Sequence, residues 1–471
     1  MKVFWEEELV YNNYRRGENT LVFTSNLKMF MFNHKEINFI KIFPEDASGK
    51  DYFEAKSEGV IYRHVHGIES KEDLVAWYEM LKADCPNYSY YNMNINTAHL
   101  SFNWAKRTFR YEDKKSLLDP QYKELCSNNE ELYNAFKSTY FNGYFFNNCK
   151  PNVVYKNVYS YDFKSNHSAI MFYEKFPTKF TIIAPKHADK LIKEKKSFYG
   201  HFTIYFKNHA DYLRQFAHRY NESKKQMTGY FNNIDIEFFE KLCGIQAIDC
   251  DKLWEVELDF ISKKLRKAIK RLFLLKETLP KGIERDRVKL ALEKIYGNCA
   301  KRRTYNEEAT WEDVNEELHH NFEYSIGVWT VSYCRLRLLT IQKAIGKDAI
   351  YGDIDSIKFC NKKNCAIIDK VNKGIDKNFP LGLLSFEYCA REFKALSQKT
   401  YCAATDKGLQ IACAGANKEI VQSYFESLDE PVKNFSRDFP PEIKPYKTVV
   451  IENDKMVYKW VSSADTATII L

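Results

Sequence analysis

The segment from Ala349 to Lys358 constrains the fold more than any other part of this 471-residue chain. It reads Ala-Ile-Tyr-Gly-Asp-Ile-Asp-Ser-Ile-Lys, an apolar run followed by a Gly-Asp turn and by alternating apolar and polar residues. This pattern predicts a β-hairpin with Asp353 and Asp355 at its tip. Side chains two positions apart on an extended chain share a face, so the two carboxylates should lie close together. A divalent cation would relieve their repulsion, whereas a solvated Asp-rich turn is the alternative for this motif alone.

Composition limits the classes of protein to which the chain can belong. The 71 Lys and Arg against 63 Asp and Glu give a net charge of +8, which permits a polyanionic partner without requiring one. No run of about 18 apolar residues occurs and the N-terminus is acidic, so neither a membrane span nor a signal peptide is expected. The 12 Cys form no Cys-x-x-Cys pair, which favours free cytoplasmic thiols.

Aromatic and β-branched runs predict strands at 20–24, 28–32, 37–43, 180–183 and 201–206. Helical patterns are expected at 71–81, 211–220, 234–242, 261–276, 281–303 and 327–345. The tail predicts a hairpin of 447–451 with 456–461. The tripeptide Asp235-Ile236-Glu237 matches the sequence pattern of an exonuclease carboxylate pair, but the start of an amphipathic helix explains it better.

A second candidate for chemistry is Asp162, where the run Val158-Tyr-Ser-Tyr-Asp-Phe-Lys-Ser ends a predicted strand and a helix begins. Such a junction can hold a metal on the carboxylate and a phosphate on the free backbone N–H groups. The alternative is that Asp162 only caps the helix.

The basic helix of 281–303 carries Arg285, Lys289 and Tyr296 on one face. Cations beside an aromatic ring suit a nucleoside triphosphate, although a solvated charged face is the alternative. The aromatic run that begins Tyr140-Phe-Asn-Gly143 could stack on a nucleic acid strand or form an ordinary turn. Further on, Lys399-Thr400-Tyr401 lies in a predicted strand.

Taken together, these motifs resemble those of family B DNA polymerases, most closely the small protein-primed polymerases of bacteriophages. The resemblance runs from about residue 140 nearly to the C-terminus. In chain order it comprises a Tyr-x-Gly-Gly-like segment at Tyr140–Gly143, motif A at Asp162–Ser165, motif B at Lys289–Gly297, motif C at Tyr351–Ser356 and a Lys-x-Tyr motif at Lys399–Tyr401.

The resemblance implies an α+β right-hand architecture of palm, fingers and thumb, and it assigns a role to each motif residue. Catalysis would fall to Asp162, Asp353 and Asp355, and metal binding to Asp162, Phe163 and Asp355. The implied cofactor is a pair of Mg²⁺ ions, for which Mn²⁺ can substitute. The nucleotide would contact Arg285, Lys289, Tyr296, His167 and Ser165. The primer and template would contact Tyr140, Gly143, Lys399, Thr400 and Tyr401.

The domain boundaries implied by the resemblance follow the same order. We expect a reduced α+β N-terminal domain at 1–139, palm at 140–174, an insertion typical of protein-primed polymerases at 175–262, fingers at 263–303, a short second insertion at 304–325, palm again at 326–410 and thumb at 411–471.

Three departures from the family pattern qualify these expectations. His167 stands where the family has a Tyr that excludes the 2′-hydroxyl; His is smaller and can titrate, so weaker sugar discrimination is a hypothesis. Glu293 replaces an Asn and would either lower the affinity for nucleotide or pair with Lys289 or Lys294. Residues 1–139 lack the Asp-x-Glu, Asn-x-x-Phe-Asp and Tyr-x-x-x-Asp motifs of the 3′–5′ exonuclease, so we expect no proofreading.

The leading hypothesis is therefore a template-directed, metal-dependent DNA polymerase, with protein priming left open. The alternatives are a nucleotidyltransferase with relaxed sugar or template requirement and a catalytically idle nucleic-acid-binding protein. Expected partners are primer-template DNA, deoxynucleoside triphosphates, a terminal priming protein, and a separate exonuclease or replication subunit, with no membrane. The expected location is the cytoplasm, that of the host cell if a phage encodes the chain.

Overall fold

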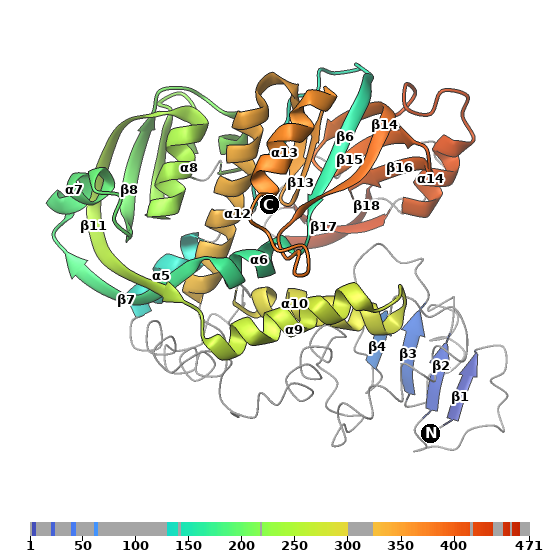
Figure 1. Cartoon of the computed structure of the whole chain (residues 1–471), viewed down its shortest axis with the longest axis horizontal. Helices are drawn as coiled ribbons and strands as arrows, with labels where there is room; N and C mark the ends of the chain where they lie inside the picture. The colour runs from blue at the N-terminus through green and yellow to red at the C-terminus, as the bar shows by residue number, and fades with distance from the viewer. Residues whose placement is uncertain are drawn as a thin grey trace.

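A computed structural model describes most of the chain between residues 130 and 436, together with short strands near both ends. The described ranges are 2–5, 20–23, 39–43, 61–64, 130–139, 143–216, 219–299, 324–414, 418–436, 446–452 and 455–461. Helices and sheets are mixed throughout, and the long helix α12 (Tyr324–Ile345) lies between two large sheets (Figure 1). Most of α12 is apolar and buried on all sides, as expected of a helix packed between two layers.

The larger of the two sheets has seven strands, and all of its neighbouring pairs are antiparallel. Its central strand β6 pairs with β13 on one side and with β14 on the other, which brings together segments about 200 residues apart in sequence. The spatial order is β16 (Gly408–Cys413), β15 (Thr400–Thr405), β14 (Leu384–Ser397), β6 (Tyr155–Phe163), β13 (Ser356–Phe359), β12 (Ala349–Asp353) and β5 (Phe145–Asn147).

The second sheet has five antiparallel strands and contains the strands predicted at 180–183 and 201–206. The helix predicted at 211–220 is wrong in part, because a short 3₁₀ helix (Asp211–Phe216) ends before Tyr220, which begins a strand. The order is β7 (Lys175–Ile183), β11 (Ile245–Phe260), β8 (Phe198–Phe206), β10 (Gln226–Asn232) and β9 (Tyr220–Asn221), with α7 (Ala188–Lys193) nearby.

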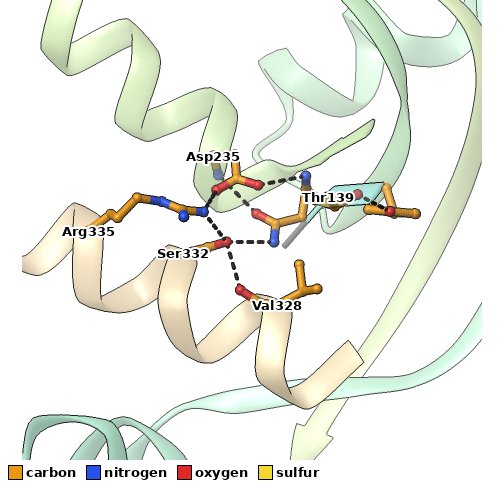
Figure 2. Close-up of polar contacts among 7 residues, drawn as sticks. Thr139, Asp235, Val328, Ser332 and Arg335 are labelled. Atoms are coloured by element: carbon orange, nitrogen blue, oxygen red, sulfur yellow. Dashed lines mark hydrogen bonds and ion pairs between the residues drawn. The ribbon is translucent and has the colours of Figure 1, made fainter. Parts of the chain in front are cut away.

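A buried ion pair joins the helix α8 (Asn233–Cys243) to α12. The carboxylate of Asp235 lies 2.6 Å from the Arg335 guanidinium, and the two side chains are only 1% and 3% exposed. Asp235 also forms a reciprocal capping box with Asn232, whose amide donates to Ser332 of α12 (Figure 2). The prediction that Asp235 starts a helix is therefore confirmed.

The basic helices α9 (Lys263–Thr278) and α10 (Ile283–Cys299) pack against each other and against the helix α6 (Asn166–Tyr173). Ser262 caps α9 by accepting a hydrogen bond from the backbone N–H of Leu265 at 3.1 Å. Both helices bury their apolar residues in one core with α5 (Glu130–Thr139) and α12. This core holds α10 beside the N-terminal turn of α6, which follows Asp162 in the chain.

The two ends of the chain contribute separate small sheets. Near the N-terminus β1 (Lys2–Trp5), β2 (Thr20–Phe23), β3 (Phe39–Phe43) and β4 (Ile61–His64) form a parallel sheet, which confirms the predicted strands at 20–24 and 37–43. The predicted tail hairpin is also confirmed, as β17 (Tyr446–Glu452) and β18 (Lys455–Val461).

Two further α-helices are α13 (Cys365–Asn372) and α14 (Lys418–Glu426). The elements predicted at 28–32 and 71–81, and the second insertion up to residue 323, lie outside the described residues. None of the helices within the described ranges is both long and apolar enough to cross a membrane.

Candidate active site

Strand pairing at the centre of the seven-stranded sheet brings the three predicted acids to one place. Asp162, next to last in β6, lies opposite Ser356 of β13 and Ser385 of β14. The backbone N–H of Phe163 donates to the carbonyl of Asp355 at 2.8 Å. Asp162 is not the helix cap, because β6 continues to Phe163 and Ser165 occupies the cap position of α6. The capping alternative for Asp162 is therefore wrong.

The hairpin that carries the other two acids turns two residues later than its sequence suggests. Gly352 and Asp353 are the last residues of β12, and the turn is formed by Ile354 and Asp355. Ile354 adopts a left-handed conformation with φ 57°, and its N–H donates to the carbonyl of Tyr144 at 2.9 Å. The predicted Gly-Asp turn is thus wrong in position, although Asp353 and Asp355 still reach the same cavity.

Two glycines allow the close approach that this hairpin requires. A Cβ atom on Gly143 would lie 2.8 Å from Cγ1 of Ile354, and one on Gly352 would lie 2.3 Å from Cε1 of Phe146. Gly143 was predicted to meet template; in this structure it packs under the turn. Tyr140, its predicted partner in that role, lies outside the described residues.

The carboxylates line a cavity of about 240 Å³. Five of its lining residues are predicted site residues, and four are not. The lining residues are Asp162, Asp353, Asp355, Ser356, Lys358, Glu387, Lys399, Tyr401 and Ala412.

Glu387 and Lys358 are the charged residues that sequence reasoning missed. The pairing of β14 with β6 shifts register between Phe386 and Tyr388, so Glu387 lies at a bulge, a feature that redirects side chains. Its carboxylate accepts a hydrogen bond from Ser160 at 2.7 Å. Lys358 could have been found, because it lies two residues beyond Ser356 and therefore on the same face of β13. Glu387 carried no such signal.

Burial and mutual repulsion disturb the ionisation of these acids. Burial, followed by the charges of Asp355 and Glu387, raises the pKa of Asp162 to about 8. Burial and the charge of Asp353 raise the pKa of Asp355 to about 6, and burial also raises the pKa of Asp353. Burial is thus the main cause of these shifts, and repulsion between carboxylates adds to it at Asp162 and Asp355.

The Lys-x-Tyr segment borders the same cavity. Lys399 precedes β15 in a left-handed conformation with φ 51°, and its N–H donates to the Tyr351 hydroxyl at 2.8 Å. The ring of Tyr401 lies 5.4 Å from that of Tyr351. Thr400 is buried and absent from the cavity lining, so the structure brings together Lys399 and Tyr401 but not Thr400.

The residues predicted to bind nucleotide gather around the start of α6. His167 stacks on Tyr296 of α10, with ring centroids 4.2 Å apart. Ser165 accepts a hydrogen bond from the ammonium of Lys276 at 2.9 Å, so Lys276 of α9 is a further cation that the motifs did not identify. Burial lowers the pKa of His167 to about 4, so its ring is neutral at physiological pH. The expectation that it titrates near neutrality is wrong.

The cations of α10 differ in their surroundings. Lys289 is exposed and pairs with Glu293 at 3.9 Å, which confirms one of the two predicted partners of Glu293. Arg285 is half-buried, and its charge contributes to lowering the pKa of Lys276, after the larger effect of burial. Arg285, Lys276 and Ser165 therefore form one neighbourhood.

Comparison with known proteins finds matches in structure only. No protein-family model and no curated protein sequence matches the chain. A solved complex of Phi29 DNA polymerase with primer-template DNA and incoming nucleotides matches with a TM-score of 0.59 and 15% identity over 83% of this chain and 70% of that one. The chain has a fold similar to Phi29 DNA polymerase. Its primer-template binary complex gives a TM-score of 0.60 at 13% identity, covering 93% and 90%.

A further Phi29 DNA polymerase structure, with single-stranded DNA, matches with a TM-score of 0.59 and 16% identity, covering 94% of this chain and 90% of that one. These identities are low, so the similarity concerns the fold. At the level of the fold, this similarity confirms the resemblance to DNA polymerases that the order of the motifs indicated.

The carboxylates of the cavity could hold a divalent ion. No three Asp, Glu, His or Cys side chains within the described ranges are arranged to hold one ion as they stand. Mg²⁺ prefers hard oxygen ligands, and in nucleotide-binding sites it is commonly held by one or two carboxylates with substrate phosphates supplying the rest. Asp162 and Asp355 fit that pattern. Phe163 could contribute only its backbone carbonyl, because its ring is buried 4.0 Å from the Arg337 guanidinium.

Proposed function

We propose that this chain is a template-directed DNA polymerase that adds deoxynucleotides to the 3′-hydroxyl of a primer. The observation that carries the proposal is the convergence of Asp162, Asp353 and Asp355 on one cavity, with Lys399 and Tyr401 at its border. The fold around this cavity is similar to that of Phi29 DNA polymerase, which has been solved with primer-template DNA and incoming nucleotide. Primer-template DNA and deoxynucleoside triphosphates are therefore the proposed partners.

In this proposal the seven-stranded sheet is the palm, and α9 with α10 forms the fingers. The thumb comprises 411–471, with the β17–β18 hairpin gripping duplex DNA. The five-stranded sheet is the insertion at 175–262, a candidate contact for a priming protein.

The proposed chemistry follows from the charges around the cavity. Asp162 and Asp355, with the carbonyl of Phe163, would hold Mg²⁺, which supplies activation of the primer hydroxyl and neutralisation of the leaving pyrophosphate. Asp353 adds negative charge beside them. Arg285 and Lys289 attract the triphosphate. Lys399 and Tyr401 hold the primer end against the cavity, so the hydroxyl is oriented before reaction.

Two finer features belong to the proposal. The chain lacks proofreading, since residues 1–139 contain none of the exonuclease motifs. Discrimination against ribonucleotides is weak, since the half-buried His167 has a smaller ring than Tyr. The second feature favours one alternative function, a nucleotidyltransferase with relaxed sugar choice.

A template-swap assay tests the proposal. Four primer-templates that differ only in the first unpaired template base are incubated with the full chain, Mg²⁺ and each deoxynucleotide in turn. Addition of the complementary nucleotide on every template supports a template-directed polymerase. Addition that ignores the template base favours the nucleotidyltransferase, and DNA binding without addition favours a requirement for a protein primer or an idle binding protein.

A further inference from the structure

Lys358 is a buried cation in the carboxylate cavity with no role in the motifs. Its side chain lines the cavity, yet the residue is only 2% exposed. Its ammonium lies 4.7 Å from the ring centre of Tyr401 and 5.4 Å from that of Tyr351. Within the described residues no hydrogen bond or ion pair holds this ammonium, which lies over the two tyrosine rings.

The sheet fixes the position of Lys358 relative to the acids. Lys358 lies opposite Ser160 of β6, just as Ser356 lies opposite Asp162. Ser160 in turn donates to Glu387 at 2.7 Å. Lys358 therefore lies one strand from Asp162 and two strands from Glu387, on an interior strand that cannot move without breaking pairs on both sides.

The charges that line this cavity are unequal. Four carboxylates face it, those of Asp162, Asp353, Asp355 and Glu387, against the two ammonium groups of Lys358 and Lys399. Lys399 lies in a turn and is exposed. Lys358 is the cation enclosed by the sheet. A fixed positive charge in a partly dehydrated site repels any divalent ion that enters, because the local dielectric screens the repulsion poorly.

We propose that Lys358 is a fixed internal cation that sets, and weakens, the affinity of the carboxylate cavity for divalent ions. The inference rests on the proposed function for the identity of the ligand. It requires no contact between Lys358 and DNA or nucleotide. It explains why a lysine is buried beside acids that it does not pair with directly.

Direct ion binding tests this role without any measurement of polymerisation. The full chain, free of DNA and nucleotide, is titrated with Mn²⁺ while unbound Mn²⁺ is followed by electron paramagnetic resonance. Lys358→Met should bind Mn²⁺ more tightly by roughly tenfold or more. Lys358→Arg, which keeps the charge, should stay near the native affinity. Lys179→Met is the matched control, since Lys179 is an exposed partner of Glu257 on the five-stranded sheet.

Unchanged Mn²⁺ affinity in Lys358→Met overturns the inference, and weaker affinity overturns it in favour of a role in ordering the acids. Circular dichroism checks each fold, and Lys358→Gln replaces the Met variant if that one is unfolded. The variant Asp355→Ala distinguishes failure of the Lys358 inference from failure of the proposed metal site. If the native chain binds no Mn²⁺, or if Asp355→Ala binds it equally well, the proposed metal site itself is wrong.

Discussion

The imidazole ring of His167 stacks on the phenol ring of Tyr296, with their centroids 4.2 Å apart and their planes inclined by 23°. The contact joins the first turn of α6 to the last turn of α10, and α6 begins directly after motif A. Because burial lowers the pKa of His167, the stack involves a neutral ring at physiological pH. His167 therefore serves as a packing surface. Its ring differs from that of a tyrosine in size and not in charge.

The first prediction concerns sugar selection. His167→Tyr should increase the preference for deoxynucleotides over ribonucleotides by roughly tenfold or more, because the larger ring fills space that a 2′-hydroxyl would need. Single-nucleotide incorporation rates with matched deoxy- and ribonucleotides measure the ratio. His167→Phe, which has the ring but no hydroxyl, is the control for size. A native chain that already rejects ribonucleotides strongly would contradict the hypothesis.

The second prediction concerns pH. The pKa of Asp162 is about 8 in the folded chain against an ordinary 3.8, so the folded state binds more protons between these values. The free energy of unfolding of the metal-free chain should therefore fall as pH rises through this window, by at most about 1.4 kcal/mol per unit. Asp355, with a pKa of about 6, acts in the same direction.

Thermal unfolding between pH 6.5 and 8 measures this slope. His167 adds little there: its folded pKa is depressed to about 4, so its contribution to stability is present above 6.5 and lost on acidification. Asp162→Asn should flatten the profile. A native melting temperature that rises with pH over this interval would contradict the prediction. It would show that ionisation of Asp162 does not destabilise the folded chain.

The third prediction concerns the buried ion pair between Asp235 of α8 and Arg335 of α12. Asp235→Leu leaves Arg335 buried without its counter-charge and should cost about 3–5 kcal/mol of unfolding free energy. The double variant Asp235→Leu/Arg335→Met should recover most of this loss. Glu237→Ala, which breaks an exposed pair with Lys241 on the same helix, should cost less than about 1 kcal/mol. Equal losses of unfolding free energy for Asp235→Leu and Glu237→Ala in denaturant titration would refute the assignment of Asp235 and Arg335 as a buried ion pair.

The fourth prediction concerns the glycine under the hairpin. Gly352→Ala places a methyl group against the ring of Phe146 and should destabilise the chain by about 1–3 kcal/mol. Adding Phe146→Leu should relieve part of the clash. Gly297→Ala is the control, because the nearest side-chain atom to its new methyl is 3.9 Å away and alanine favours a helix. Chemical denaturation in which the two alanine variants behave alike would count against the packing described.

Much of the site was predictable because its residues lie on regular elements. Asp353 could be placed from its hairpin strand and Asp162 from a strand that ends before a helix, whereas Asp355 lies in the turn and still lines the cavity. Lys289 and Glu293 could be paired from helical spacing alone. Each of these signals acts over a few residues, where local geometry decides which side chains meet.

The features that sequence reasoning missed depend on long-range packing or on irregular backbone. Glu387 reaches the cavity through a β-bulge, and the turn, with its left-handed Ile354, lies two residues later than predicted. Lys276 meets Ser165 only because α9 packs over α6. No pattern near these residues encodes such contacts, since the partner lies on an element distant in sequence.

Primer extension by the native chain and by Asp355→Ala, with Mg²⁺ and a labelled primer-template, tests the polymerase proposal most directly. Asp251→Ala is the control, since it removes an exposed acid on the five-stranded sheet. We expect templated extension by the native chain and the control, and extension reduced to background by Asp355→Ala with DNA binding retained. Extension by Asp355→Ala at the native rate would contradict the assignment of this cavity as the active site.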